Sequence, residues 1–155
     1  MAIQVVEKDE MKVVGLSWTG TYSQVSTIPS LFNKMEDRLH EVCHQTNDSV
    51  TIAPFHSRET EFTYYVTKPV EKIADVPEGM LGFTIPGKNY VFTTHVGKPE
   101  EVENTYHQMF TWMEEYGYEQ DHQALGLEIY HEYKHLHPTG DVHIEIYLPV
   151  KTYKD

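Results

Sequence analysis

Two short runs near the C-terminal end place carboxylates and tyrosines at every second position. The alternating residues are Glu128, Tyr130 and Glu132 in the run 125–132, and His143, Glu145 and Tyr147 in the run 142–150. Tyrosine rings offer a stacking surface and a π-face that attracts cations, and a carboxylate neutralises the charge of a bound cation. A carboxylate set among rings could also act as a general acid or base. The two runs therefore suggest binding of a cation, or proton transfer on a small molecule.

The same alternation is found in ordinary strands. An antiparallel strand with one solvated face alternates apolar and polar residues, and tyrosine is a common strand residue. The pattern alone therefore leaves two interpretations open, a ligand-binding face and a simply solvated face.

The remaining residues of the two runs predict how they are placed. Leu127 and Ile129 share one face of the first strand, and the matching face of the second is wholly aliphatic, from Val142 to Leu148. The segment 137–141 contains Pro and Gly and predicts a turn, so the strands form a hairpin. We expect each strand to turn its apolar face toward a helix. The acidic and aromatic residues of both strands then form one surface.

An internal repeat organises the whole chain. The segment 13–20 resembles 90–97 at an offset of 77 residues, and each is a β-rich run that ends in Gly. Each is followed by a helical pattern, predicted over about 24–45 and 99–116. Further strands are predicted over 62–67 and 80–85. The sequence thus predicts one α+β domain with two pseudo-symmetric halves, about 1–75 and 76–155, and a ligand cleft between them.

Composition excludes several classes of function. The formal charge of −12 argues against non-specific nucleic-acid binding and against an anionic membrane surface. One cysteine, Cys43, excludes an intramolecular disulfide, and we expect it to be a buried thiol. No leader or membrane span is evident, so we expect a cytoplasmic protein. No Gly-rich phosphate loop is present, and we expect no cofactor.

Four histidines in 131–143 raise the question of a metal site. They are His131, His135, His137 and His143. They are spread over a strand end, a turn and the next strand, so we expect exposed polar residues and no metal.

Four stretches in order carry a family resemblance. They are 62–66, 76–92, 105–118, and 127–130 with 144–150. With these stretches the chain resembles the GyrI-like small-molecule-binding family, over about residues 3 to 151. The same domain is the effector-binding module of bacterial multidrug and AraC-type regulators.

The resemblance implies a fold and a site. The fold is α+β, with two βαββ repeats that form a curved antiparallel sheet, two helices on one side and a central aromatic cleft. Glu128 matches a glutamate that lies in this cleft. Glu145 and Tyr147 match a second acidic residue and a tyrosine that line the pocket in drug-binding members, and Trp112 matches an aromatic position on the second helix.

Other aromatic residues are candidates through the repeat and the strand pattern. Trp18 aligns with His95, and either can reach the cleft. Phe62 and Tyr64 share one strand face and Tyr65 the other, so only one set can line the pocket. The predicted ligand-binding set is Glu128, Tyr130, Glu145, Tyr147, Trp112, Tyr65, Trp18 and His95.

Three functions follow as hypotheses. The first is binding of small lipophilic, cationic or electrophilic compounds, with Glu128 supplying charge. The second, implied by hydrolase-like members of the family, is opening of cyclopropane-type genotoxins, with Glu128 as general base. The third is a gyrase-inhibitor-like interaction protein. No helix-turn-helix remains to be placed, so we do not expect direct DNA binding, although a regulator or gyrase is a possible partner. We expect a monomer or a homodimer.

Overall fold

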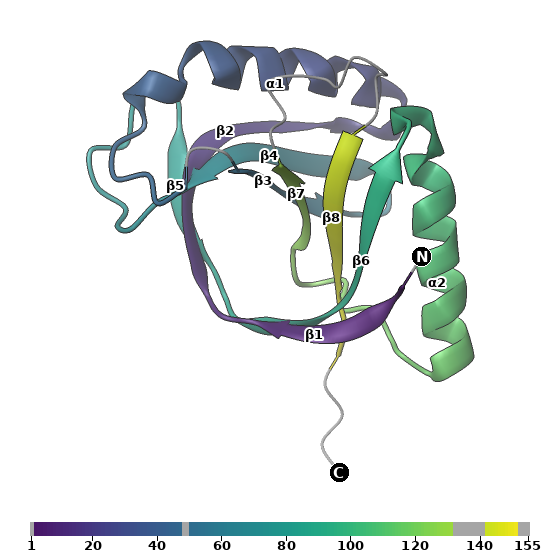
Figure 1. The fold of residues 1–155 in the computed structure, drawn as a ribbon. Coiled ribbons are helices and arrows are strands. Elements are labelled where there is room, and N and C mark those ends of the chain that lie inside the picture. The colour runs from purple at the N-terminus through teal and green to yellow at the C-terminus, as the bar shows by residue number, and fades with distance from the viewer. Residues whose placement is uncertain (1, 48–49, 132–141, 152–155) are drawn as a thin grey trace.

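The computed structural model describes residues 2–47, 50–131 and 142–151. In this part of the chain eight antiparallel strands form one curled sheet in the order β1-β6-β8-β7-β3-β4-β2-β5 (Figure 1). The strands are β1 (Gln4–Lys8), β2 (Met11–Thr21), β3 (Val50–Ser57), β4 (Glu61–Pro69), β5 (Leu81–Ile85), β6 (Lys88–Gly97), β7 (Gly126–His131) and β8 (Val142–Pro149). The helices are α1 (Ile28–Asp37) and α2 (Val102–Tyr116), with short 3-10 helices at Tyr22–Thr27, Leu39–Glu41 and Pro99–Glu101. The predicted α+β fold with a curved antiparallel sheet is confirmed.

The strand pairing follows the repeat predicted from the sequence. Gln4 pairs with Phe92 between β1 and β6, and Leu81 pairs with Gly15 between β5 and β2. Leu81 is 77 positions after Gln4, and Phe92 is 77 positions after Gly15, so the second pair repeats the first with the two halves exchanged. The halves meet where β3 pairs with β7, and Ile52 lies opposite Ile129 there. These two residues are also 77 positions apart, so the pseudo-two-fold axis passes through this pair.

Prolines and a glycine limit the helices. Pro29 stands in the first turn of α1. Because its ring has no N–H and collides with the preceding turn, the α-helix cannot run from residue 24 through Pro29 as predicted, and it also ends at Asp37, before residue 45. The segment is instead a 3-10 turn, a ten-residue α-helix and a second 3-10 turn. The second helix matches its prediction, since it begins after Pro99 and ends at Gly117, whose φ of 77° suits glycine.

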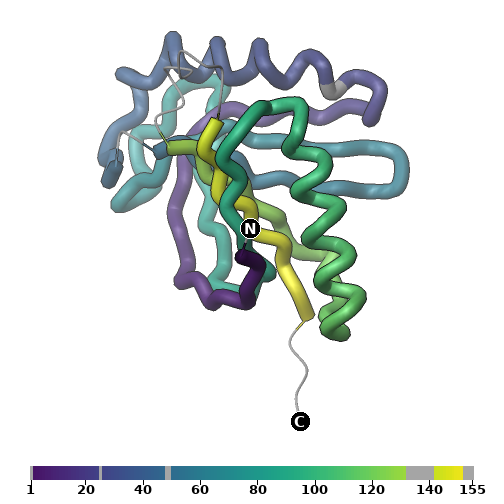
Figure 2. Tube along the Cα trace, turned by 45° about the vertical axis from the view of Figure 1, so that its right-hand side comes forward, coloured from purple at the N-terminus to yellow at the C-terminus, as the bar shows by residue number. Residues whose placement is uncertain are grey.

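The two faces of the sheet are buried differently. One apolar cluster joins both helices to the outside of the curl and contains Phe32, Met109 and Ile146. We call this side the helix-covered face. A second cluster contains only residues outside the α-helices, among them Leu127 and Tyr147, and it defines the inner face. Figure 2 shows α1 crossing the top of the sheet and α2 lying along its side.

The pairing of β7 with β8 corrects one prediction. Glu128 lies opposite Ile146, and Ile129 lies opposite Glu145. Since directly opposed residues share a face, Glu128 is on the helix-covered face and Glu145 on the inner face. The prediction of one shared acidic and aromatic surface is therefore wrong. In β8 the aliphatic face does meet the helices, but β7 turns its acidic face to them. Glu132 and the predicted turn 137–141 lie outside the described residues.

Two further expectations can be compared with the structure. Cys43 is exposed, contrary to the expected buried thiol, because it follows the last helical turn in an irregular segment. No helix in the described ranges is long and apolar enough to span a membrane.

Gly15 gives a test of the strand packing. A Cβ at this position would lie 2.1 Å from the Val66 carbonyl oxygen and 2.6 Å from the Thr67 Cα. Because both neighbours are backbone atoms, we expect Gly15→Ala to lower the free energy of unfolding by about 3 kcal/mol. In the control Gly117→Ala no atom lies within 4 Å of the new Cβ, so only backbone strain of about 1 kcal/mol is expected. Urea unfolding measures both, and equal losses would contradict the packing.

Candidate functional site

Glu128 is the centre of a hydrogen-bonded cluster of tyrosines. Its Oε1 accepts hydrogen bonds from the hydroxyls of Tyr64 at 2.7 Å and Tyr130 at 2.8 Å. Its Oε2 accepts one from the Tyr106 hydroxyl at 2.5 Å. The Tyr64 and Tyr130 hydroxyls are also 3.2 Å apart. Three phenols thus converge on one buried side chain that is 9% exposed.

Three elements position this cluster. Glu128 and Tyr130 are two residues apart on β7, so both point to the helix-covered face. Tyr64 reaches the carboxylate from β4, across β3. Ala53 lies directly opposite Glu128 on β3 and has only a methyl group, which leaves room for the carboxylate. Tyr106 comes from α2 and closes the cluster from outside the sheet.

Burial and the Glu128 charge keep the tyrosine hydroxyls protonated, so that they donate hydrogen bonds. Burial, and then the Glu128 carboxylate, raises the pKa of Tyr64 well above its ordinary value. The same causes raise the pKa of Tyr106. Among the described residues no basic side chain forms an ion pair with Glu128. A carboxylate held by neutral donors alone keeps its charge available to a cation.

A cavity of about 230 Å³ opens beside the carboxylate. It is lined by Phe55, Ser57, Phe62, Tyr106, Phe110, Gln120, Glu128 and Leu148. The Phe55 ring lies 6.0 Å from that of Phe62 and 6.4 Å from that of Tyr106. Phe110 is 44% exposed, so its ring forms the solvent-facing wall. Apolar rings with a few polar groups are typical of small-molecule sites.

The predicted pair Glu128 and Tyr130 is brought together here, but Glu145 and Tyr147 are not part of this cluster. On the inner face, Glu145 accepts a hydrogen bond from the Tyr147 hydroxyl at 2.6 Å. Its other oxygen is 2.9 Å from His131 Nε2. Burial, and then Glu145, raises the pKa of Tyr147. This second acidic and aromatic group joins β7 to β8 on the side away from the Glu128 cavity.

Trp18 and Tyr65 fall on different faces. Trp18 is on the helix-covered face, where its ring packs edge-on against Phe62 at 6.4 Å. It therefore supports a wall of the cavity from behind. Tyr65 points to the inner face and contacts Phe83, with ring centres 5.0 Å apart. The set that meets Glu128 is thus the alternative one, Phe62 and Tyr64.

His95 and Trp112 have other partners. His95 is buried, with Nδ1 2.7 Å from the Thr105 hydroxyl and Nε2 3.0 Å from the Lys98 carbonyl oxygen. These bonds attach the start of α2 to β6. Trp112 stacks on Tyr118 at 5.5 Å and lines a separate depression of about 280 Å³ on α2. Both residues were predicted in the ligand site, and neither lines the Glu128 cavity.

The sequence prediction did not include Tyr64, Tyr106, Phe55 and Phe110. A signal existed for Tyr106, because Met109 and Met113 follow it at helical spacing on the buried side of α2. For Tyr64 the signal was its shared strand face with Phe62. Phe55 and Phe110 had no distinguishing pattern.

Within the described ranges no group of three or more His, Cys, Asp or Glu side chains could hold a metal ion. His135 and His137 of the histidine-rich stretch lie outside those ranges.

Comparison with known proteins places this geometry in a family. The model of the GyrI-like small molecule binding domain matches residues 1–151. The transcriptional regulator BrlR of Pseudomonas aeruginosa is 26% identical over 112 residues, which cover 72% of this chain and 41% of the regulator. The chain therefore matches about two fifths of that relative's length.

Solved structures share the fold. The structure of SAV2435 bound to tetraphenylphosphonium superposes with a TM-score of 0.77 at 16% identity, and the match covers 97% of this chain and 94% of SAV2435. A hydrolase encoded by lin2189 from Listeria innocua superposes with a TM-score of 0.60 at 14% identity, with 96% and 91% of the two chains covered.

Alkaline unfolding tests the buried phenols. The unfolded chain releases its tyrosine protons near pH 10, whereas folded Tyr64 and Tyr106 keep theirs to higher pH. Their contribution to the free energy of unfolding is therefore fully present below about pH 10. It is lost as the pH rises through the folded pKa, at about 1.4 kcal/mol per pH unit for each phenol. In Tyr64→Phe we expect the free energy of unfolding to fall less steeply with pH, because one of the two phenols no longer contributes to the slope. Urea unfolding at pH 9 to 11 measures it, and an unchanged slope would contradict the burial of this hydroxyl.

Proposed function

The chain belongs to the GyrI-like small-molecule-binding family, and from this premise we propose that it binds lipophilic cations in the cavity beside Glu128. One observation carries the proposal. A buried carboxylate is held by three phenols, has no basic partner in the described part of the chain, and lines an aromatic cavity.

The physical argument is one of charge and desolvation. A buried carboxylate is costly unless hydrogen bonds or an opposite charge compensate it. The tyrosine hydroxyls supply the hydrogen bonds, and a ligand cation supplies the opposite charge. The Phe55, Phe62 and Phe110 rings remove the apolar surface of such a ligand from water. Their π-faces add cation–π attraction.

The comparison with SAV2435 supports this ligand class. Tetraphenylphosphonium, bound in that structure, is a lipophilic cation. The present cavity of about 230 Å³ is smaller than the 300 Å³ or more that is usual for drug-sized ligands. A ligand of that size must therefore extend beyond this cavity, and a smaller cation fits inside it.

Tetraphenylphosphonium binding tests the proposal. We expect Glu128→Gln to weaken binding at least about tenfold, because the substitution keeps the shape and removes the charge that faces the cation. Isothermal titration calorimetry measures the affinity. The matched control is Glu145→Gln, the same substitution on the inner face, for which we expect less than about a twofold change. Equal affinities for wild type and Glu128→Gln would refute the cation site.

A second candidate function is hydrolysis of a strained electrophile such as a cyclopropane. The hydrogen bond from the Tyr106 hydroxyl to Glu128, which places a proton donor beside the carboxylate, and the shared fold with a Listeria innocua hydrolase favour it. Glu128 would take a proton from water as the water oxygen bonds to a ring carbon. The C–C bond at that carbon would break, a neighbouring phenol would protonate the carbon that leaves, and Glu128 would then return its proton to the phenolate. The expected result is product in excess of protein, with turnover lost in Glu128→Gln. Disappearance of substrate limited to one equivalent per protein would exclude an enzyme.

The gyrase hypothesis stays a prediction of the sequence. A DNA supercoiling assay with gyrase and micromolar protein tests it, and it fails if supercoiling is unchanged.

A further inference from the structure

The Glu128 carboxylate keeps one hydrogen-bond acceptor site unused. An ionised carboxylate has about four lone-pair sites, two on each oxygen. Both sites of Oε1 are filled, because it accepts hydrogen bonds from the Tyr64 and Tyr130 hydroxyls. Within the described ranges Oε2 accepts from the Tyr106 hydroxyl alone. One lone-pair site of Oε2 is therefore left for a further donor.

This open site is on the side of the carboxylate that faces the cavity. Tyr106, the partner of Oε2, lines the cavity of about 230 Å³, whereas Tyr64 and Tyr130, the partners of Oε1, do not. The single hydroxyl proton of Tyr106 is given to Oε2, so its oxygen can only accept a hydrogen bond from a ligand. Glu128 and Tyr106 thus present two acceptors to the cavity and no donor.

The other polar groups of the cavity add to this set. The Gln120 amide and the Ser57 hydroxyl line it, and neither side chain has a hydrogen-bond partner in the part of the chain that the structure describes. Gln120 is half-buried and Ser57 is exposed, so the Ser57 hydroxyl lies where the cavity meets solvent. No lysine, arginine or histidine is among the lining residues that the structure describes. The polar lining therefore suits a ligand that carries positive charge and donates hydrogen bonds.

A cation that has no hydrogen to donate satisfies only part of this site. The Phe55, Phe62 and Phe110 rings line the cavity, so a ligand packed against them displaces water from the acceptors as well. An acceptor that loses water and gains no donor costs affinity. A site built to hydrogen-bond a ligand discriminates strongly against an analogue that lacks the donor.

We propose that the ligand is a protonated amine on an aromatic group, whose N–H groups donate to Glu128 Oε2, the Tyr106 hydroxyl oxygen and the Gln120 amide oxygen. The inference rests on the proposed function and narrows its ligands from lipophilic cations in general to those with N–H donors. A primary ammonium has three donors, which matches the three acceptors. Because Oε2 and the Tyr106 oxygen are hydrogen-bonded to each other, one ammonium nitrogen can contact both.

A pair of ligands tests the donors without any variant. 2-Phenylethylammonium and its N,N,N-trimethyl analogue share the ring and the charge, and three N–H groups in the first are methyl groups in the second. If charge and apolar area alone decided the affinity, the trimethyl form would bind more tightly, because its methyl groups add apolar surface. We expect the opposite, with the trimethyl form about tenfold weaker on wild type. Isothermal titration calorimetry measures both affinities.

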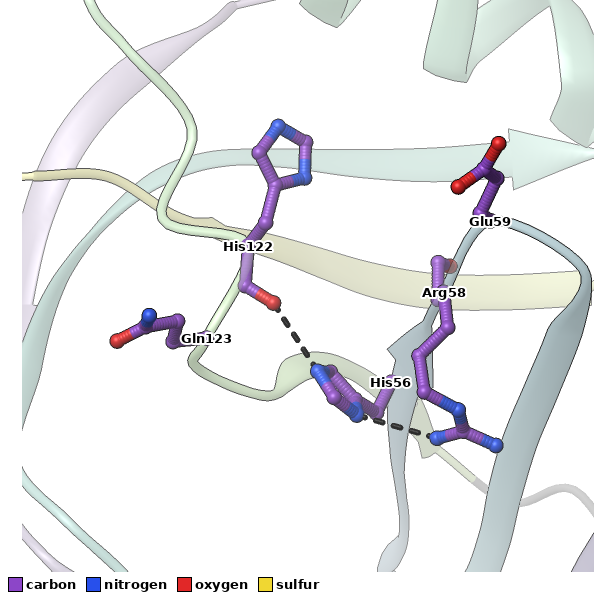
Figure 3. Close-up of a pocket in the computed structure, with 6 residues that line it drawn as sticks. His56, Arg58, Glu59, His122 and Gln123 are labelled. Carbon is purple, nitrogen blue, oxygen red and sulfur yellow. Dashed lines mark hydrogen bonds between the residues drawn. The ribbon is translucent and has the colours of Figure 1, made fainter.

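Gln120→Met tests one of the acceptors, since it keeps an unbranched side chain of similar length and removes the amide. We expect about fivefold weaker binding of 2-phenylethylammonium and less than a twofold change for the trimethyl form. A preference caused only by the size of the methyl groups would not depend on this amide. The matched control is Gln123→Met, which leaves both affinities unchanged. Gln123 lies three residues later and lines a different cavity, together with His56 and His122 (Figure 3).

The outcomes separate this inference from the proposed function. If neither cation binds, or if both bind equally to wild type and Glu128→Gln, the proposed function fails and the inference fails with it. If both depend on Glu128 but the trimethyl form binds as tightly as the primary ammonium, the N–H inference alone is wrong. An equal effect of Gln120→Met on the two cations, or no effect, also overturns it.

Discussion

The buried carboxylate of Glu128 is the constraint on which the rest of the site depends. It stands on β7 beside the seam of the two halves, and it would be expensive in an apolar interior without partners. The hydroxyls that compensate it come from β4, α2 and β7 itself. Hydrogen bonds to a charged group are worth about 1.5–3 kcal/mol each, so this one side chain links the helix to both halves of the sheet. The wall of the cavity is positioned by the same bonds.

That arrangement prepares the site for a ligand before the ligand arrives. The donors and the rings are already oriented, so binding loses little conformational freedom. The inner face carries a second group of the same residue types, which have different partners. There Glu145, Tyr147 and His131 satisfy one another, and the Tyr147 ring stacks on Phe92 at 4.7 Å. Carboxylates near tyrosines therefore serve packing on one face of β7 and β8 and leave charge available on the other.

The sequence predicted the repeat, the second helix and the strands β2 and β4 to β8, because these depend on local periodicity and on turn residues. It did not predict β1 or β3. It could not predict which side of β7 meets the helices. Both sides of that strand are bulky, and a shift of one residue in pairing exchanges them. The register is set by the partners β3 and β8, which are distant in sequence from each other. For the same reason the sequence could not show that Tyr64, and not Tyr65, shares the face of Glu128. The helical spacing of Tyr106, Met109 and Met113 indicated that Tyr106 faces the sheet. Its hydrogen bond to Glu128 could not be predicted, because it depends on how α2 packs on the sheet.

The pseudo-symmetry explains on which side of the seam the Glu128 cavity lies. The axis through Ile52 and Ile129 relates Glu128 to Thr51 and Tyr130 to Ala53, each 77 positions earlier. The position equivalent to Tyr106 is Pro29, which stands in the first turn of α1 and has no hydroxyl. The first half thus supplies neither the carboxylate nor the helix phenol, while its small Ala53 leaves space against Glu128. A symmetric pair of carboxylates so close to the axis would repel each other. The duplicated fold therefore supports the site because its two halves differ at the seam.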